Sequence, residues 1–311
     1  PPSVLAALPD QEFPHLRQII VAGEACSPDL VDRWAPGRRF FNAYGPTETT
    51  VWATVEQCDG SDARPPIGRP LINTTIYLFD EQGQLAPIGE PGEIYIGGVG
   101  LARGYLGRPE LTAERFVVNP FAEADKPHTA RLYRTGDLGR FLPDGRIEFL
   151  GRIDHQVKLR GFRIELGEIE AVLSRHPAVQ EGVVVLREDV PGQKRLVAYV
   201  VPNSVGKNSN GSLSGGLRQY LAAQLPDYMV PPVYVMMDAM PLTPNSKVDR
   251  KALPAPDTQQ VERSGDFVAP RSPNEELLAQ IWCDVLQLDQ VSITDNFFEL
   301  GGDSILSIQI I

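Results

Sequence analysis

The fold is decided within GRIDHQVKLRGFRIELGEIE (residues 151–170), where the character of the chain changes. Before this stretch, TTIYLFDEQGQLAPIGEPGEIYIGG (residues 74–98) predicts strands around turns at Glu81-Gln82-Gly83 and Glu90-Pro91-Gly92. In its second half, ELGEIEAVLSRHP (residues 165–177) carries apolar residues at helical spacing and stops at a proline. Basic side chains and glycines surround Asp154. They predict either a charged surface turn between two domains or a hinge with basic groups that reach phosphates.

The chain after this stretch predicts a small α+β domain followed by a helical one. GVVVL (residues 182–186) and RLVAYVV (residues 195–201) have the character of strands. LRQYLAAQL (residues 217–225) predicts a short helix after a polar loop. A capping box with proline at the first helical position, SPNE (residues 272–275), starts the last domain. We therefore predict an α/β and α+β multidomain protein, divided into residues 1–153, 154–252, a polar and proline-interrupted linker at 253–271, and 272–311.

The composition excludes several classes of function. The 311 residues leave room for two or more domains, and the net charge of -11 argues against nucleic-acid and anionic-membrane partners. We find no run of about 18 apolar residues and no secretory signal. The 3 cysteines are far apart and lack metal-ligand spacing, which predicts a reduced, cytoplasmic protein. A start without methionine and an abrupt end suggest a segment of a longer polypeptide.

Two polar stretches could carry nucleotide chemistry. NAYGPTETT (residues 42–50) is either an ordinary polar turn or a nucleotide loop. In a nucleotide loop Tyr44 stacks on a base, Asn42 bonds the edge of that base and Glu48 holds magnesium. YRTGDLGR places Asp137 in a glycine-flanked turn between strands. That carboxylate either accepts hydrogen bonds from ribose hydroxyls or is a solvated hairpin residue.

Two further residues are ambiguous on their own. Lys247, in PLTPNSKVDRKALP, is a lone loop lysine of the kind that is usually a surface charge. Ser304, in FFELGGDSILSI, follows Asp303 at a predicted helix start. This serine is either part of an ordinary cap or a solvent-facing hydroxyl at the positive end of a helix.

In this order, the stretches resemble the adenylation domains of nonribosomal peptide synthetases, within the adenylate-forming enzymes that include acyl-CoA synthetases and luciferase. The resemblance covers almost the whole chain and rests on NAYGPTE, GEIYIGGVGLARGYL, YRTGDL, GRIDHQVKLRGFRIELGEIE, LPDYMVP and NSKVDR. The final LGGDS resembles the attachment site of a peptidyl carrier domain. The resemblance implies the end of a large adenylate-forming subdomain, a small α+β subdomain on a hinge, and a truncated helical carrier domain.

The resemblance also implies a function. An amino-acid carboxylate attacks the α-phosphate of ATP, and a phosphopantetheine thiol captures the aminoacyl adenylate. The implied cofactors are ATP, Mg²⁺ and 4'-phosphopantetheine. The implied partners are the amino acid, a phosphopantetheinyl transferase and neighbouring condensation domains, while Asp303 points to a following epimerisation domain.

Each site residue takes its role from the resemblance. The catalytic residues are Lys247, Glu48 (also the Mg²⁺ ligand) and Lys158. The ATP or AMP contacts are Asn42, Tyr44, Thr47, Asp137, Phe149 and Arg152, the hinge is Asp154, and Ser304 carries phosphopantetheine. The substrate pocket is lined by Ile20, Ala22, Ala43, Val51 and Trp52. Because these five are uncharged, an apolar or aromatic amino acid is expected.

The sequence departs from the usual pattern of the family at two points, and two alternative functions stay open. Ser246 stands where the family usually has glycine. The family's phosphate loop and amino-group-binding aspartate are expected upstream of Pro1, so the chain is expected not to adenylate alone. One alternative is an inactive carrier scaffold that only presents Ser304, which joint retention of Glu48, Asp137, Arg152 and Lys247 disfavours. The other is a stand-alone acyl-CoA synthetase relative, which the linker and LGGDS disfavour.

Overall fold

The computed structural model divides the chain into two compact units, which are described separately. Unit 1 comprises Pro1–Ala6 and Asp10–Gly161, and unit 2 comprises Ala7–Pro9 and Phe162–Ile311. The structure describes residues 1–8, 13–154, 156–189, 194–207, 213–244, 247–256, 267–286, 288–297, 300, 302 and 306–310. In these ranges, no helix combines the length and the apolar character needed to cross a membrane.

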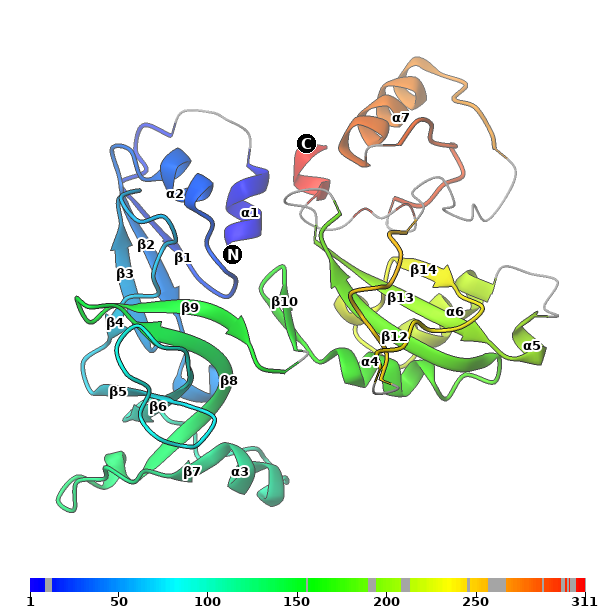
Figure 1. Cartoon of the computed structure of the whole chain (residues 1–311). Helices are drawn as coiled ribbons and strands as arrows, with labels where there is room; N and C mark the ends of the chain where they lie inside the picture. Colours follow the sequence, from blue (N-terminus) through cyan, green and yellow to red (C-terminus); the bar gives the residue numbers. More distant parts are fainter. Residues whose placement is uncertain are drawn as a thin grey trace. The chain divides into compact units, whose positions relative to one another are not determined.

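The first sheet of unit 1 contains four strands in sequence order (Figure 1). They are β1 (Gln18–Val21), β2 (Arg39–Tyr44), β3 (Thr54–Cys58) and β4 (Arg69–Pro70). β1 and β2 are parallel and the other pairs are antiparallel. The parallel pair is joined through α2 (Pro28–Trp34), as a parallel connection requires a crossover. Two short helical segments, α1 (Pro2–Ala7) and η1 (Thr47–Thr49), also belong to this part of the chain.

Helix α2 begins and packs as its sequence dictates. Ser27 is the N-cap, and its hydroxyl oxygen accepts a hydrogen bond from the Leu30 amide at 3.3 Å. Pro28 occupies the first turn, where a missing N–H costs nothing. The apolar face buries Val31 and Trp34, which are 1% and 4% exposed. The helix therefore contributes to the core of unit 1.

The second sheet of unit 1 carries most of the candidate site. Its order is β5 (Thr74–Phe79), β6 (Gly92–Gly98), β8 (Arg131–Phe141) and β7 (Phe116–Val118), and β9 (Ile147–Arg152) also pairs with β8. Two short helices, α3 (Pro109–Arg115) and η2 (Pro127–Thr129), lie in the connections. A buried cluster that includes Leu78, Ile94, Ile147 and Tyr44 joins residues of both sheets.

Two predicted turns are partly strand, and both predictions are corrected here. Asn42 and Tyr44 lie in β2, so the loop of the first polar stretch begins only at Gly45. Asp137 lies inside β8 and not in a turn between strands. Gly136 adopts φ 73°, and the pairing of β8 shifts register nearby, so this glycine marks an irregularity in a continuing strand.

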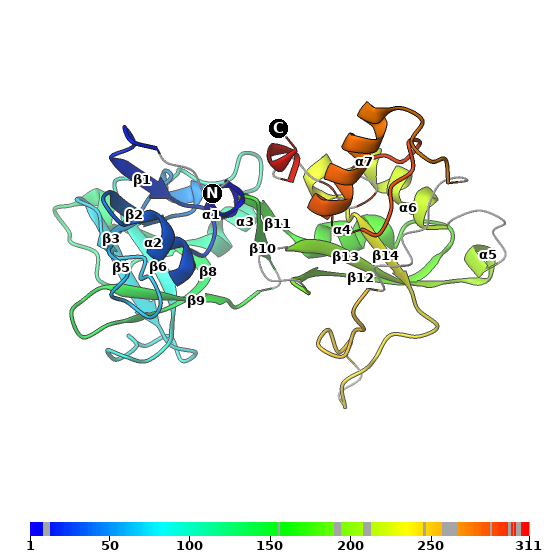
Figure 2. The same cartoon turned by 90° about the horizontal axis from the view of Figure 1, so that it is seen from above.

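Unit 2 contains a mixed three-stranded sheet. β12 (Val179–Arg187) and β13 (Arg195–Pro202) are antiparallel, and β14 (Val233–Met236) is parallel to β13. Helix α4 (Leu166–Leu173) packs against β12 and against α6 (Leu213–Ala222) (Figure 2). Earlier in the chain, β10 (Val157–Leu159) and β11 (Phe162–Ile164) form a two-stranded ribbon. The remaining elements are α5 (Ser204–Lys207), η3 (Asp227–Met229), α7 (Pro273–Leu286) and η5 (Leu306–Gln309).

The strands and both helices of the predicted small domain are present, as α4 within residues 165–177 and as α6, which begins at Leu213 and not at Leu217. The polar loop of this domain was predicted too long. Residues 204–207 form α5, because the Asn203 side chain accepts hydrogen bonds from the amides of Val205 and Gly206 at 2.9 and 3.2 Å. Strand β14 was not predicted from the sequence. Leu253, the first residue of the predicted linker, is 4% exposed in the core of unit 2. The rest of that linker lies mainly outside the described residues.

The predicted capping box at the start of α7 forms with a small change. The Ser272 hydroxyl accepts a hydrogen bond from the Glu275 amide at 3.3 Å. The Glu275 carboxylate accepts a hydrogen bond from the amide of Arg271 at 2.6 Å. In a standard capping box the donor would be the amide of the N-cap residue, here Ser272.

Candidate functional site

A buried carboxylate is the centre of the candidate site. Asp137 is 2% exposed, which excludes the solvated-hairpin alternative. Its Oδ2 accepts a hydrogen bond from the Tyr44 hydroxyl at 2.6 Å, and its Oδ1 pairs with Nη1 of Arg152 at 2.5 Å. The structure thus brings together three predicted site residues from β2, β8 and β9.

The local backbone of β8 explains why Asp137 is held there. The Thr135 hydroxyl donates to the Ile94 carbonyl at 2.7 Å, and its oxygen accepts from the Asp137 amide at 2.9 Å. A Cβ on Gly136 would come within 2.8 Å of Nη2 of Arg152. Only glycine at this position combines a φ of 73° with the close approach of the guanidinium. Thr135 was not identified from the sequence, where it is one hydroxyl among many.

The predicted hinge residue is tied to the same guanidinium. Asp154 accepts two hydrogen bonds from Arg152, Nε to Oδ1 and Nη2 to Oδ2, both at 2.7 Å. Burial alone lowers the pKa of Arg152, but the hydrogen bonds and charges of Asp154 and Asp137 outweigh it and raise that pKa. The guanidinium is therefore a permanent positive charge shared by two carboxylates.

The Asp154 ion pair predicts a small loss of stability in acid. Burial raises the pKa of Asp154, but hydrogen bonding and the charge of Arg152 lower it overall from its ordinary value of 3.8. A depressed carboxyl pKa stabilises the fold above the unfolded pKa, and this stabilisation is lost as pH falls through the folded pKa. Because the side chain is 33% exposed, we expect less than about 1 kcal/mol. In urea unfolding measured between pH 6 and 2, the free energies of unfolding of the unaltered chain and of Asp154→Asn should converge below about pH 4. The exposed Asp125→Asn serves as control, and a constant gap for Asp154→Asn would contradict the assignment.

Aromatic rings and a lysine lie beside the carboxylate cluster. The rings of Tyr44 and Phe149 are tilted by 38° with centroids 6.0 Å apart. The ammonium of Lys158 lies 5.3 Å from the centroid of Tyr44 and 5.7 Å from that of Phe149, within cation–π range. Desolvation, followed by the charge of Asp137, raises the pKa of Tyr44 well above its ordinary value, so its hydroxyl remains a donor. Asn42 is 3% exposed, and its side-chain amide donates to the Pro66 carbonyl at 2.8 Å.

Glu48, the predicted magnesium ligand, is held by a tyrosine that was not predicted from the sequence. The Tyr105 hydroxyl donates to Oε1 of Glu48 at 2.7 Å and lies 3.3 Å from the Tyr133 hydroxyl. Nothing in the sequence pairs Tyr105 with a residue 57 positions away. Among the described residues, no group of three or more His, Cys, Asp or Glu side chains could hold a metal. One carboxylate still fits Mg²⁺, which is usually bound by one or two carboxylates together with substrate phosphates.

The loop that contains Glu48 has residues with unusual backbone φ angles. Thr47 is the first residue of η1, and Thr50 and Val51 follow with φ of 61° and 71°. β-branched residues in this region cost about 1–3 kcal/mol each, and such outliers concentrate at functional sites. A Cβ on Gly45 would lie 2.6 Å from the Ala53 nitrogen, so the glycine is required for this close packing. The sequence alone predicted a loop here but not its strain.

The predicted pocket residues lie on the first sheet and on this loop. Ile20 is paired with Phe41 across β1 and β2, so period-two alternation along β2 places Ala43 on the same side as Ile20, and Ala22 follows directly after β1. Ile20, Val51 and Trp52 are exposed by 42%, 65% and 36%, whereas Ala43 is buried. Ile20, Val51 and Trp52 therefore offer exposed apolar side chains, although their role in a substrate pocket stays a prediction.

The two predicted sites of unit 2 differ in what the structure describes. Lys247 is exposed, and its backbone is fixed by Thr243, whose amide and hydroxyl bond its carbonyl and amide at 2.7 and 3.2 Å. Asn245 and Ser246 lie outside the described residues, as do Asp303 and Ser304.

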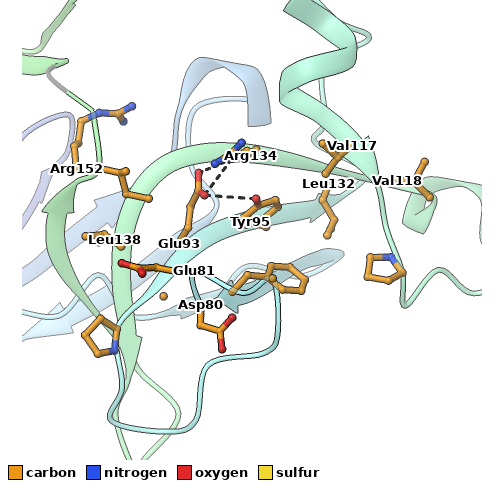
Figure 3. Close-up of a pocket in the computed structure, with 16 residues that line it drawn as sticks. Asp80, Glu81, Glu93, Tyr95, Val117, Val118, Leu132, Arg134, Leu138 and Arg152 are labelled. Atoms are coloured by element: carbon orange, nitrogen blue, oxygen red, sulfur yellow. Dashed lines mark hydrogen bonds and ion pairs between the residues drawn. The ribbon is translucent and has the colours of Figure 1, made fainter.

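A separate pocket of about 860 Å³ lies on the β5–β6–β8 sheet (Figure 3). Two of the charged residues that line it pair with each other, because Nε of Arg134 lies 3.0 and 3.1 Å from the Glu93 carboxylate oxygens. Arg152 is the only predicted site residue among those lining the pocket. The cavity is therefore not assigned to the predicted chemistry.

Sequence comparisons identify three family models along the chain. Residues 2–106 match the AMP-binding enzyme family, residues 168–247 match the AMP-binding enzyme C-terminal domain, and residues 276–311 match the phosphopantetheine attachment site. AMP-binding enzymes of this kind use ATP and Mg²⁺, and the attachment site carries 4'-phosphopantetheine.

Curated relatives are much longer than this chain. It is 56% identical over 307 residues to one of the linear gramicidin synthase proteins of Brevibacillus parabrevis, covering 99% of this chain and 4% of that protein. It is 48% identical to tyrocidine synthase 1 of the same organism, covering 100% of this chain and 28% of that protein.

Solved structures agree with this organisation. One is holo-PA1221, an NRPS protein containing adenylation and PCP domains, bound to a vinylsulfonamide inhibitor. It matches with a TM-score of 0.76 and 31% identity over 99% of this chain and 50% of that chain. PA1221 in another structure matches with a TM-score of 0.65 and 32% identity over 78% and 48% of the two chains. The chain thus belongs to the adenylate-forming enzymes as a nonribosomal peptide synthetase sequence, with an adenylation region followed by a phosphopantetheine attachment site.

Proposed function

We propose that this chain takes part in activating an amino acid with ATP and in transferring the aminoacyl group to a phosphopantetheine thiol during nonribosomal peptide synthesis. The observation that carries the proposal is the buried Asp137 carboxylate, held by Tyr44 and Arg152 beside the ring of Phe149. Each carboxylate oxygen accepts one of these hydrogen bonds and retains a lone pair for a ribose hydroxyl. The neighbouring rings offer a face on which adenine stacks.

The other site residues take roles that follow from their chemistry. Lys247 is a mobile point charge suited to the negative charge that develops on the carboxylate and α-phosphate during adenylation. Glu48, oriented by Tyr105, would hold Mg²⁺, which neutralises phosphate charge when bound. Asp154 would be the hinge at which the smaller subdomain turns between the two half-reactions. The turn removes Lys247 from the site and brings the segment that carries Lys158 to it.

The substrate is proposed to be apolar or aromatic. Ile20, Ala22, Ala43, Val51 and Trp52 offer no charge to a substrate side chain, so a charged substrate would lose solvation without gaining an ion pair. Amino-acid-dependent ATP–pyrophosphate exchange by the complete synthetase should therefore favour apolar amino acids. Best turnover with Asp, Glu, Arg or Lys would exclude this substrate class.

Ser304 is the proposed attachment point, and its modification tests the carrier role. The chain is incubated with coenzyme A and a broad-specificity phosphopantetheinyl transferase, and intact mass is measured. We expect one phosphopantetheine per chain, abolished in Ser304→Ala and retained in the nearby control Ser307→Ala. Loading that persists in Ser304→Ala would disprove the assignment. Loading without any amino-acid activation by the complete synthetase would favour an inactive carrier scaffold.

The remaining partners are proposed by the same reasoning. A phosphopantetheinyl transferase must modify the carrier, and condensation domains must consume the aminoacyl thioester to form a peptide bond. An epimerisation domain after the carrier is proposed from Asp303 alone.

A further inference from the structure

A carboxylate joins three segments of unit 1 that are distant in sequence. Glu24 follows β1, and its Oε2 accepts a hydrogen bond from the Ser3 amide at 3.0 Å. Its Oε1 accepts one from the Gly161 amide at 2.9 Å, across 137 positions of sequence. Both partners are backbone N–H groups, so both carboxylate oxygens are used as acceptors.

The backbone around these bonds is shaped for close approach. Gly23 has φ 87°, and a Cβ on it would lie 3.7 Å from the Cα of Gly161. Arg160 and Gly161 have φ of 55° and 80°, so the chain turns sharply here. Two glycines of unit 1 thus meet where the Glu24 carboxylate reaches the turn.

The same turn carries Lys158 into the candidate site. Lys158 lies on β10, three positions before Gly161, and its ammonium lies over the rings of Tyr44 and Phe149 at 5.3 and 5.7 Å. At about 3.3 Å per residue, the anchored amide is roughly 10 Å along the chain from Lys158. A fixed turn therefore limits where the Lys158 side chain can reach.

We propose that Glu24 is a positioning residue that docks the β10 segment, defined as Val157–Gly161, against the rest of unit 1 and so holds Lys158 over Tyr44 and Phe149. The docking itself is independent of catalysis. Its consequence rests on the proposed function: Glu24 stabilises the arrangement in which Lys158 is at the site, which is the one assigned to thiol transfer. Adenylation, assigned to the arrangement with Lys247 at the site, does not use this contact.

The chemistry of the two acceptors defines a discriminating substitution. Glu24→Gln keeps the size of the side chain but replaces one acceptor oxygen with an amide donor, which cannot bond a backbone N–H. Glu24→Lys removes both acceptors. Glu81→Gln is the matched control, because Glu81 is an exposed glutamate in a turn of the same unit.

Hydrogen–deuterium exchange of the 311-residue chain tests the docking. We expect amides of the β10 segment to exchange about tenfold faster in Glu24→Gln and faster still in Glu24→Lys, as one and then two charged hydrogen bonds are lost. Tryptic cleavage after Arg160 should accelerate in the same order. Exchange in β8 and β9 should stay unchanged, which separates undocking from general loss of stability. Unchanged exchange of the β10 segment in both variants would overturn the proposal.

The complete synthetase tests the consequence. In Glu24→Lys we expect aminoacyl thioester formation to fall about tenfold while ATP–pyrophosphate exchange remains within about twofold. An equal fall in both reactions, or no fall in either, would overturn the link to thiol transfer. If the unaltered synthetase activates no amino acid, the proposed function fails, and the exchange experiment still decides the docking.

Discussion

Replacing Lys247 with alanine in the complete synthetase is expected to lower amino-acid-dependent ATP–pyrophosphate exchange by about 10²–10³-fold, the usual loss for one charge-stabilising group. The reason lies in the proposed role of the ammonium, which is to stabilise the negative charge that develops during adenylation. Among the described residues, Thr243 fixes the backbone of Lys247 by bonding its amide and carbonyl, and the side chain is exposed. The substitution should therefore leave the loop folded and remove one charge from the reaction.

A nearby lysine provides the control for this prediction. Lys251 is also exposed and lies just beyond the same loop, so Lys251→Ala removes an equal charge without touching the proposed role. In Lys247→Ala the carrier should still accept phosphopantetheine at Ser304, which shows that the carrier region is intact. If Lys247→Ala retains as much ATP–pyrophosphate exchange as Lys251→Ala, the role assigned to Lys247 is wrong.

How much the sequence predicts depends on whether the signal is local. The strands predicted within residues 74–98 are present as β5 and β6, because alternation and flanking turns specify them locally, although Gly92, predicted in a turn, is the first residue of β6. The start of α7 was equally predictable from its capping box. β14 was missed because VYVM is only four residues long and gains its strand character from pairing with β13.

From the sequence, the candidate site could be predicted only for residues that lie within a recognisable motif. Asp137 and Arg152 were identified from the resemblance, but their ion pair depends on β8 and β9 pairing in register. The turn predicted around Asp137 was wrong because Gly136 suggested it. Glycine is favoured both in turns and at irregularities within a strand, and the sequence does not distinguish the two. Tyr105 and Glu24 could not be found from the sequence. Their partners lie 57 and 137 positions away, and no local pattern encodes such a contact.

Replacing Arg152 with methionine is expected to lower the free energy of unfolding of unit 1 by about 3 kcal/mol or more. The substitution keeps an unbranched side chain but leaves Asp137, which is 2% exposed, without a cationic partner. An unpaired carboxylate in such a site keeps only the Tyr44 hydroxyl as a strong donor and loses the charge that offset its desolvation. Urea unfolding followed by tryptophan fluorescence measures the loss. Trp282→Phe as a shared background makes Trp34 and Trp52 of unit 1 the reporters.

A control on the same strand pair separates a buried charge from a surface one. Arg140 also pairs across β8 and β9, with Glu148 at 2.6 Å, but its side chain is 41% exposed and Glu148 has a second partner in Arg64. Arg140→Met should therefore cost no more than about 1 kcal/mol. Combining Arg152→Met with Asp137→Asn should recover at least half of the loss, because removing both charges costs less than stranding one. Equal losses for Arg152→Met and Arg140→Met, or no recovery in the double variant, would show that the stability of this site does not depend on the charge of Asp137.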